Sequence, residues 1–162
     1  MAPSLEQIRE LPTYYAEFVG KERLDVQNHM NVAHYLILFD IEGWGLFAAL
    51  GIDETYIRER QMGVMALRHV ISYLAEVHEG DHVVLYSRLL GRSARRFHFM
   101  SYILNETQGK LAATMEGHGI HTDLKSRRSC PYPEDIAARF DQVLLRHQGL
   151  SWETELSGGI NF

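Results

Sequence analysis

Four residues with chemically active side chains are concentrated in the stretch DVQNHMN, residues 25–31. Asp25 supplies a carboxylate that could serve as a general base or as a nucleophile, and His29 supplies an imidazole. Asn28 can adopt a left-handed turn conformation, and Asn31 is a favourable first cap of a helix. Turns rich in Asp and Asn often do no more than cap a helix. The residues alone therefore allow two interpretations, a catalytic turn and a simple cap.

This polar stretch stands directly before a long apolar segment, residues 31–50, which contains no proline and stops at Gly51. These features predict a helix about 30 Å long at roughly 1.5 Å per residue. Apolar side chains occur on almost every side of it, which predicts a central helix buried by other elements. The backbone N–H groups of a first helical turn have no partner within the helix. They could stabilise a carbonyl oxygen that becomes an oxyanion, an effect of about 3 kcal/mol in enzymes.

Strands are expected on both sides of this helix, because the spacing of apolar residues changes to two. The expected strands are residues 14–20, 64–77, 82–90, 95–105 and 110–124. The later strands are joined by short turns, which predict an antiparallel meander. Residues 51–63 should be a connecting stretch, and residues 131–147 a terminal helix whose start is marked by proline.

The order of these elements predicts an α+β fold in which a curled antiparallel sheet wraps around one long helix. We expect a single domain over residues 1–148 and a tail over residues 149–162. The second face of the sheet also carries apolar side chains, from Val64, Ala66, Val70 and Leu74. A sheet with two apolar faces predicts that the outer face is buried against a second subunit.

The composition is that of a soluble globular protein, with 46% hydrophobic and 23% charged residues. A formal net charge of -5 argues against non-specific binding of nucleic acid, which needs a basic face. The N-terminal residues lack a charged stretch followed by an apolar run, and Asp40 and Glu42 interrupt the best candidate membrane span. The single cysteine, Cys130, allows no disulfide within the chain and fits a passive thiol in a reducing cytoplasm.

The stretch DVQNHMNVAHYLILF resembles the signature of hotdog-fold acyl-CoA thioesterases of the 4-hydroxybenzoyl-CoA thioesterase type. In that signature an Asp is followed by a turn, a His, an apolar residue, an Asn and a Tyr inside the long helix. The segments ISYLAEVHEGDHVVLYSRLLG and KLAATMEGHGIHTD resemble later strands of the same family, so that the similarity extends over roughly residues 14–140. Within the family, the short stretches NHMN, ALGI, RLLG and LAAT resemble the thioesterases of carnitine breakdown that hydrolyse betainyl-CoA.

The resemblance implies a hotdog fold, hydrolysis of an acyl-CoA thioester and assembly into a homodimer or homotetramer. Position by position, it makes Asp25 the catalytic carboxylate. His29 and Asn31 would shape the turn and the thioester pocket. The backbone N–H near Val32 would bind the oxyanion, and Tyr35 would line the acyl pocket.

The chain departs from the family signature inside the turn. Many relatives have Asn-Gly where this chain has Gln27 and Asn28. Asn tolerates a left-handed turn better than most residues, so we expect the turn to keep its shape, with Asn28 on the substrate-binding side. The usual Asn side chain at position 27 is absent.

Further residues are candidates for binding the acyl group. A betainyl group would need aromatic faces for its quaternary ammonium, and Tyr35, Phe39, Trp44 and Tyr73 could supply them. Glu76, late in the second expected strand, could assist water activation or hold a cationic acyl group. The alternatives are that the aromatic residues only fill the core and that Glu76 is a solvated carboxylate.

Two basic clusters are candidates for binding coenzyme A. One lies just beyond the last strand and includes Arg127 and Arg128, and the other includes Arg95. The resemblance implies that the first cluster lies near the pocket mouth and contacts the nucleotide phosphates. Exposed arginines in loops can also be plain solvated surface.

No metal and no cofactor are expected, apart from the coenzyme A of the substrate. The chain has nine histidines, but His78 and His82 only flank a turn, and His118 and His121 should point to opposite faces of a strand. No His-x-x-x-His pair on an expected helix, carboxylate–His ligand set, Gly-x-Ser-x-Gly elbow or phosphate-binding glycine loop occurs.

Two other functions remain open on the sequence. The same fold supports hydratases and dehydratases, in which His29 and Asp25 could act on a 3-hydroxyacyl chain. A non-catalytic dimer that binds acyl-CoA is the second alternative. Release of free thiol from an acyl-CoA would favour the thioesterase over both.

Overall fold

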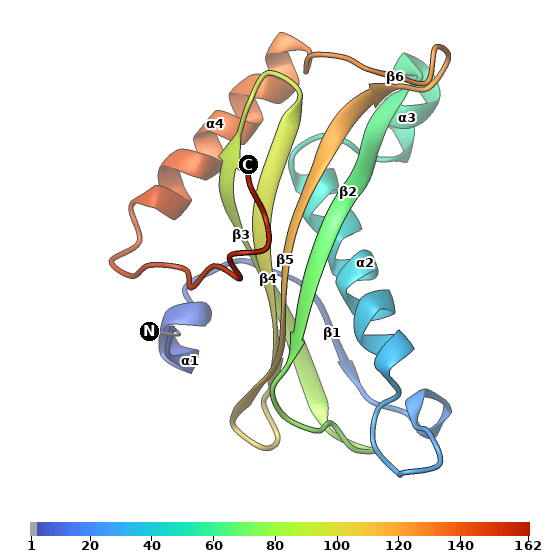
Figure 1. The fold of residues 1–162 in the computed structure, drawn as a ribbon, viewed down its shortest axis with the longest axis vertical. Helices are drawn as coiled ribbons and strands as arrows, with labels where there is room; N and C mark the ends of the chain where they lie inside the picture. The colour runs from blue at the N-terminus through green and yellow to red at the C-terminus, as the bar shows by residue number, and fades with distance from the viewer. Residues whose placement is uncertain (1–2) are drawn as a thin grey trace.

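The strands of the chain form one antiparallel sheet, against which the long helix α2 lies (Figure 1). The structure is a computed structural model and describes residues 3–162. The strands are β1 (Thr13–Phe18), β2 (Met62–Tyr73), β3 (His82–Arg92), β4 (Arg96–Asn105), β5 (Lys110–Asp123) and β6 (Arg128–Ser129). The helices are α1 (Leu5–Ile8), α2 (Val32–Ala49), α3 (Glu54–Arg60) and α4 (Glu134–Gln148), with a 3-10 turn η1 at Lys21–Arg23. The α+β class and the curled sheet beside a long helix are confirmed.

The order of the strands in the sheet differs from the expected meander. It is β1-β3-β4-β5-β2, with β6 paired to β5. Strands β3, β4 and β5 do form a meander, but the prediction that β2 and β3 are neighbours is wrong. The edge of β3 is already taken by β1, which pairs with it in the stretch from His82 to Tyr86. Strand β2 therefore crosses over, pairs with β5 along its whole length and forms one edge of the sheet.

A bulge in β2 decides which of its side chains face α2. The pairing with β5 skips Leu67, which is an extra residue on this strand. Val64 and Ala66 consequently line a groove against α2, whereas Val70 lies on the opposite face of the sheet. Leu74, just after the end of β2, contributes both to that face and to the space beside the start of α2. The prediction that all four share the outer face is wrong, because one inserted residue reverses the alternation of side chains.

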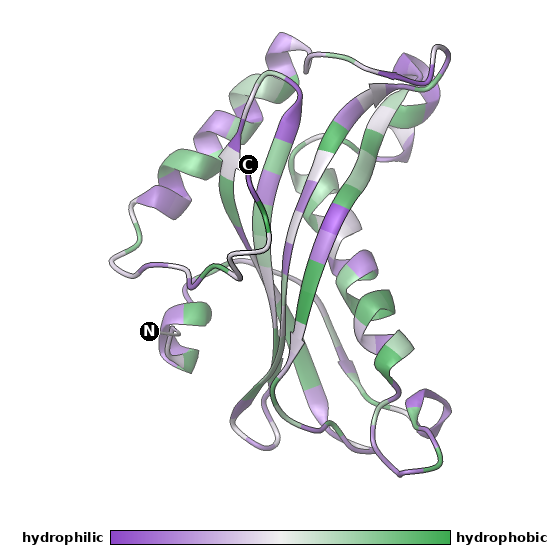
Figure 2. Cartoon of the chain, viewed as in Figure 1, coloured by the Kyte–Doolittle hydropathy of each residue, from purple (hydrophilic) through white to green (hydrophobic). Residues whose placement is uncertain are grey.

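One side of α2 packs into the concave face of the sheet, and the other side is open. The buried residues of the helix are Tyr35, Leu38, Phe39, Glu42 and Leu46. The large apolar residues exposed on its open side are Val32, Leu36, Ile37, Ile41 and Trp44. The prediction of a helix covered on all sides is wrong for a single chain, because a one-layer sheet shields only the side that it curls around. Figure 2 shows hydrophobic residues on the part of α2 that faces away from the sheet.

The length and composition of α2 alone would also allow it to cross a bilayer, contrary to the expectation drawn from Asp40 and Glu42. A core helix of a sheet protein passes the same test. The contacts of α2 with the concave face of the sheet fit such a core helix, and the fully buried Glu42 lies at that contact.

Helix α3 lies in the stretch that was expected to be a plain connection. Asp53 caps it by accepting a hydrogen bond from the Tyr56 N–H at 2.8 Å, and Gln61 ends it in a left-handed conformation with φ of 54°. The helix has only 7 residues, which is too short for a clear helical period. Its Asp cap was the one signal that the sequence offered.

The outer face of the sheet is covered in part by the two ends of the same chain. Trp152 is 5% exposed and packs beside Tyr102. The guanidinium carbon of Arg88 lies 4.3 Å from the centre of the Trp152 ring. Ile8 and Leu11, from the N-terminal segment, join the same apolar cluster. The tail after residue 148 thus buries part of the outer sheet face that was expected to contact a second subunit. The boundary between domain and tail stays a prediction.

Helix α4 runs beside β3 beyond the end of β1. The Nδ1 of His147 accepts a hydrogen bond from the Leu89 N–H at 2.9 Å. Burial lowers the pKa of His147 to about 4, so that the ring stays neutral and able to accept. Helix α4 in this way supplies a hydrogen-bond acceptor to the part of the β3 edge that β1 leaves unpaired.

Candidate functional site

The turn from Asp25 to Asn31 is closed by hydrogen bonds within itself. The Asp25 N–H donates to the His29 carbonyl at 3.1 Å, and the Asn28 N–H donates to the Asp25 carbonyl at 3.1 Å. The Asp25 Oδ1 accepts from the Gln27 N–H at 2.8 Å. Asn28 has a φ of 62°, which confirms the left-handed conformation expected of it. Gln27 therefore serves the turn through its backbone, and the departure from Asn-Gly leaves the turn closed.

The first turn of α2 offers a free hydrogen-bond donor. Asn31 caps the helix, because its Oδ1 accepts from the Ala33 N–H at 2.9 Å and its carbonyl accepts from the His34 N–H at 2.9 Å. The Val32 N–H has no acceptor among the residues that the structure describes. This donor lies at the positive end of the helix dipole, where a carbonyl oxygen or an anion is stabilised.

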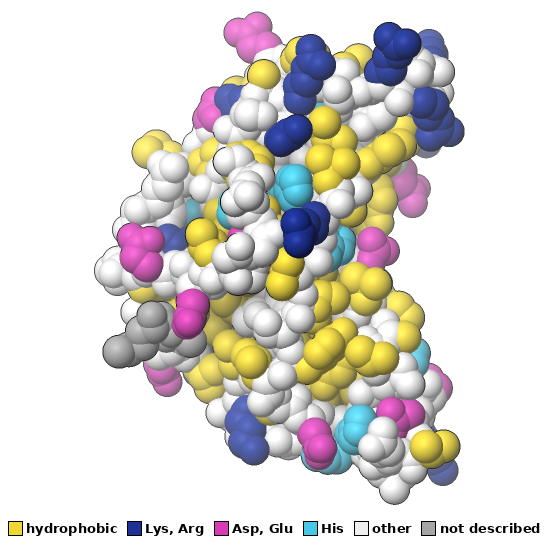
Figure 3. All heavy atoms as spheres, viewed as in Figure 1, with side chains coloured by type: hydrophobic (Ala, Val, Ile, Leu, Met, Phe, Trp, Pro, Cys, Tyr) yellow, Lys and Arg dark blue, Asp and Glu magenta, His cyan; other side chains and the backbone are white. Residues whose placement is uncertain are grey.

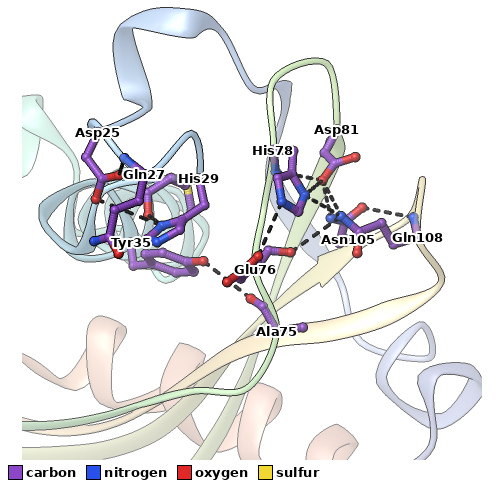
Figure 4. Close-up of polar contacts among 11 residues, drawn as sticks. Asp25, Gln27, His29, Tyr35, Ala75, Glu76, His78, Asp81, Asn105 and Gln108 are labelled. Carbon is purple, nitrogen blue, oxygen red and sulfur yellow. Dashed lines mark hydrogen bonds and ion pairs between the residues drawn. The ribbon is translucent and has the colours of Figure 1, made fainter.

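A pocket of about 500 Å³ opens between this turn, the start of α2 and the segment that follows β2 (Figure 4). Its lining residues are Asp25, Gln27, His29, Met30, Val32, Tyr35, Tyr73, Leu74, Ala75 and Glu76. The Nδ1 of His29 lies 3.9 Å from the Oδ2 of Asp25, and their side chains are 28% and 20% exposed. The fold thus brings together, in one pocket, six of the residues proposed for catalysis and acyl binding.

Two tyrosine rings meet across the pocket, one from α2 and one from β2. The centres of the Tyr35 and Tyr73 rings lie 5.1 Å apart, edge to face at 81°. The Tyr35 hydroxyl donates to the Ala75 carbonyl at 3.4 Å. Burial raises the pKa of Tyr35, and the nearby Glu76 carboxylate raises it further, so this phenol stays neutral. The rings provide an aromatic wall close to the start of the helix.

Phe39 and Trp44 do not line this pocket. They lie in a separate groove of about 460 Å³ between α2 and β2. Most of its lining is apolar, with Asp40 and His69 as its titratable groups. Figure 3 shows hydrophobic side chains gathered on this side of the molecule. Phe39 is itself 1% exposed and belongs to the core.

The arginines proposed for coenzyme A lie at the far end of the sheet. Arg128 pairs with Asp123, which in turn pairs with Met62 at the beginning of β2. The pocket is lined by Tyr73 and the three residues that follow it, at the other end of that strand. The expectation that this cluster lies near the pocket mouth is wrong within one chain.

The two basic clusters form a single group in space. The guanidinium of Arg95 donates to the Ser129 hydroxyl at 3.4 Å, which places it beside Arg127 and Arg128. Arg127 occupies the turn between β5 and β6 with a φ of 58°. Their assignment to coenzyme A stays a prediction.

A polar network centred on the buried Asp81, next to the pocket, was missed by the sequence reasoning. The Asp81 Oδ2 accepts from the His78 N–H at 2.8 Å, from the Asn105 amide at 2.7 Å and from the Gln108 amide at 2.7 Å. Burial raises the pKa of Asp81, but these hydrogen bonds outweigh burial and hold the pKa below its ordinary value. The network touches the pocket through His78, whose Nε2 lies 3.4 Å from the Oε2 of Glu76.

No group of three potential metal ligands occurs among the described residues 3–162. The Nε2 of His121 is 2.8 Å from the Tyr56 hydroxyl, and the His121 ring is fully buried. The Cys130 Sγ lies 3.3 Å from the His121 Nδ1. Burial raises the pKa of Cys130, which favours the protonated, unreactive thiol.

Comparisons with known proteins identify the family and the fold. Residues 19–140 match the family model of the thioesterase-like superfamily. A betainyl-CoA thioesterase of Pseudomonas aeruginosa is 28% identical over 138 residues, which cover 85% of this chain and 87% of that protein. An L-carnitine dehydrogenase/betainyl-CoA thioesterase of Rhizobium meliloti is 28% identical over a match covering 78% of this chain and 25% of that protein.

Solved structures share the architecture. A hypothetical protein from Staphylococcus aureus, in complex with CoA, aligns with a TM-score of 0.84 at 22% identity, over 94% of this chain and 96% of that one. A 1,4-dihydroxy-2-naphthoyl-CoA thioesterase from Synechocystis aligns with a TM-score of 0.70 at 17% identity, over 80% of this chain and 95% of that one. At these identities the likeness concerns the fold, and it confirms the expected hotdog arrangement.

Proposed function

The chain belongs to the thioesterase-like superfamily, and from this membership we propose that it hydrolyses an acyl-CoA thioester in the pocket at the start of α2. One observation carries the proposal. A free backbone donor at Val32 and the carboxylate of Asp25 share a pocket whose wall is aromatic. Hydrolysis of a thioester needs a donor for the oxyanion and a base for water.

The proposed reaction assigns each of these groups a step. The thioester carbonyl oxygen accepts the Val32 N–H, and Asp25 takes a proton from a water molecule that attacks the carbonyl carbon. The oxyanion then collapses, the carbon–sulfur bond breaks, and the thiolate of coenzyme A leaves and is protonated. In the alternative route Asp25 attacks the carbonyl itself, and water hydrolyses the resulting mixed anhydride.

We propose betainyl-CoA as the acyl substrate. The relative from Pseudomonas aeruginosa is named for this substrate. In the pocket, the lining residues include the carboxylates of Asp25 and Glu76 and the rings of Tyr35 and Tyr73, and no Lys or Arg. Carboxylates and aromatic faces both attract a quaternary ammonium, the latter by about 0.5–2 kcal/mol per ring.

The length of the betainyl group selects among the aromatic candidates. Its ammonium is one methylene away from the thioester carbonyl, so the group must be recognised close to the start of α2. Tyr35 and Tyr73 meet this condition. Trp44 lies more than three helical turns beyond Val32 along α2, about 18 Å from it at 1.5 Å per residue, and we do not assign it to the acyl group.

We further propose that a second copy of the chain completes the site. The outer edge of β2 has no strand partner among the described residues, and apolar side chains of α2 and β2 are exposed beside it. Strand β2 has 12 residues and spans about 40 Å at 3.3 Å per residue. Antiparallel pairing of two β2 strands would bring Arg127 and Arg128 of the second copy to the pocket end of the first. They could then contact the phosphates of coenzyme A.

The test is release of free coenzyme A from a panel of acyl-CoAs. The panel includes betainyl-CoA and 3,3-dimethylbutyryl-CoA, in which a carbon replaces the ammonium nitrogen without a change of shape. We expect thiol release from betainyl-CoA and a higher KM for the neutral isostere. Tight binding without release of thiol would show a binding protein instead, and addition or loss of water on a 3-hydroxyacyl chain would show a hydratase.

A further inference from the structure

We propose that His78 is a positioning residue that holds the Glu76 carboxylate at the pocket wall and thereby gives the enzyme its preference for positively charged acyl groups. The inference rests on the proposed thioesterase function. The inference adds to that function the residues that determine which class of acyl group is preferred.

The geometry of three side chains carries this inference. The imidazole of His78 lies between two carboxylates, with its Nε2 3.4 Å from the Glu76 Oε2 and its Nδ1 3.9 Å from the Asp81 Oδ2 (Figure 4). Of the three, only Glu76 lines the pocket. His78 therefore connects a pocket residue to a fixed point in the fold.

The contact of His78 with Gln108 indicates which ring nitrogen carries the proton. The Nε2 of the Gln108 amide lies 3.1 Å from the His78 Nδ1. An amide nitrogen can only donate, so the Nδ1 of a neutral ring accepts and the ring proton is on Nε2. The ring proton is then on the nitrogen nearest to Glu76, 3.4 Å from its Oε2, so the contact between the two side chains is attractive.

Asp81 supplies the rigid end of the arrangement. Its side chain is 8% exposed, whereas those of His78 and Glu76 are 48% and 68% exposed. Besides the His78 backbone, it binds the side chains of Asn105 and Gln108. Without the contact to His78, an exposed glutamate would sample several rotamers and spend less time at the pocket wall.

The position of Glu76 suits recognition of a cation next to the thioester carbonyl. The residue directly follows Ala75, whose carbonyl accepts the Tyr35 hydroxyl, so Glu76 adjoins the wall made by Tyr35 and Tyr73. Asp25, by contrast, enters the pocket from the turn before α2 (Figure 4). One carboxylate is thus placed with the helix start and the other with the aromatic wall.

The experiment compares betainyl-CoA with 3,3-dimethylbutyryl-CoA in steady-state release of coenzyme A. Glu76→Gln should raise the KM for betainyl-CoA about tenfold and leave the KM for the neutral isostere unchanged. His78→Ala should raise the KM for betainyl-CoA about threefold, with kcat retained, because an exposed charge contact is modest. In the Glu76→Gln background, His78→Ala should add nothing.

Two further variants separate positioning from folding. His78→Gln keeps an N–H donor and should recover most of the wild-type KM. His78→Leu has no donor but a similar size, and it replaces His78→Ala in the cycle if that variant does not fold. Glu79→Gln removes an exposed carboxylate from the same turn and should leave the KM for both substrates unchanged.

Several outcomes would overturn the inference. An equal change of KM for both substrates, or the same His78 effect with and without Glu76, would make His78 merely structural. A fall in kcat at constant KM would place Glu76 in the chemical step. A wild-type preference for the neutral isostere would refute cation recognition while leaving the thioesterase intact. Absence of hydrolysis for every acyl-CoA would refute the proposed function first, and this inference with it.

Discussion

The imidazole Nδ1 of His29 lies 3.9 Å from the Oδ2 of Asp25, within the turn that leads into α2. The other carboxylate oxygen of Asp25, Oδ1, accepts the Gln27 N–H at 2.8 Å. One oxygen is therefore fixed by the backbone, and the other lies beside the imidazole of His29. This arrangement allows the chemistry of Asp25 to be removed while the shape of the turn is kept.

Asp25→Asn should abolish most of the activity and preserve the fold. The Asn side-chain oxygen can still accept the Gln27 N–H, but it cannot take a proton from water. We expect kcat to fall about 10²- to 10⁴-fold, with the free energy of unfolding within about 0.5 kcal/mol of wild type. Release of coenzyme A and urea denaturation measure the two effects. The matched control is Asp40→Asn, an exposed carboxylate in the other groove, which should retain wild-type kcat. Turnover by Asp25→Asn at the wild-type rate would show that Asp25 is not a catalytic residue.

A single turnover in 18O-labelled water should place the label in the product acid and none in Asp25. We expect this result because both the side chain and the backbone of Asp25 are bonded within the turn, so that an activated water reaches the carbonyl more easily than the carboxylate does. Mass spectrometry of the peptide that contains Asp25 checks this. A gain of one 18O atom in that peptide would instead establish the route through a mixed anhydride.

Glu42→Gln should change the pH dependence of stability. Glu42 is fully buried between α2 and the sheet, where its Oε2 accepts hydrogen bonds from Ser87 at 2.7 Å and Ser101 at 3.3 Å. Burial raises its pKa from 4.5 to about 7, and the serine hydrogen bonds oppose the rise only in part. The folded state therefore keeps a proton that the unfolded chain has lost between these values. The stabilisation is complete below pH 4.5 and is lost as the pH rises through 7.

Replacement by Gln removes this dependence. Relative to wild type, the free energy of unfolding of Glu42→Gln should increase by up to about 3 kcal/mol between pH 4.5 and pH 8. Urea denaturation across this range provides the measurement, with the exposed Glu79→Gln as the control. Parallel curves for Glu42→Gln and wild type would show that the buried carboxyl titrates normally.

Leu67→Glu should weaken association of two chains. Leu67 is 51% exposed at the bulge of the edge strand β2, so an added charge costs little within one chain but would lose its hydration in the proposed β2 interface. We expect the mass measured by light scattering to shift toward the monomer. Leu145→Glu, at a residue that is 74% exposed on α4, should leave the mass unchanged. An oligomer unaffected by Leu67→Glu would place the interface elsewhere.

The sequence predicted the elements that depend on local patterns. Alternating apolar residues gave the long strands, the uninterrupted apolar segment gave α2, and the Asp and Asn residues gave the turn before it. The left-handed Asn28 was predicted for the same reason, since its conformation follows from its own side chain and its neighbours. The short α3 was missed, because seven residues are too few for a helical period to emerge.

Only the tertiary structure decided how distant segments meet. The place of β2 beside β5 depends on which strand edges are left free, and the bulge at Leu67 depends on register with that partner. His78, Asn105 and Gln108 gather around Asp81 from a turn and from a hairpin, a convergence that no spacing along the chain encodes. The pocket at Asp25 was readable because a turn and the helix that it starts are contiguous. Its opposite wall, with Glu76 and His78, was not, because it is brought there by the folding of the sheet.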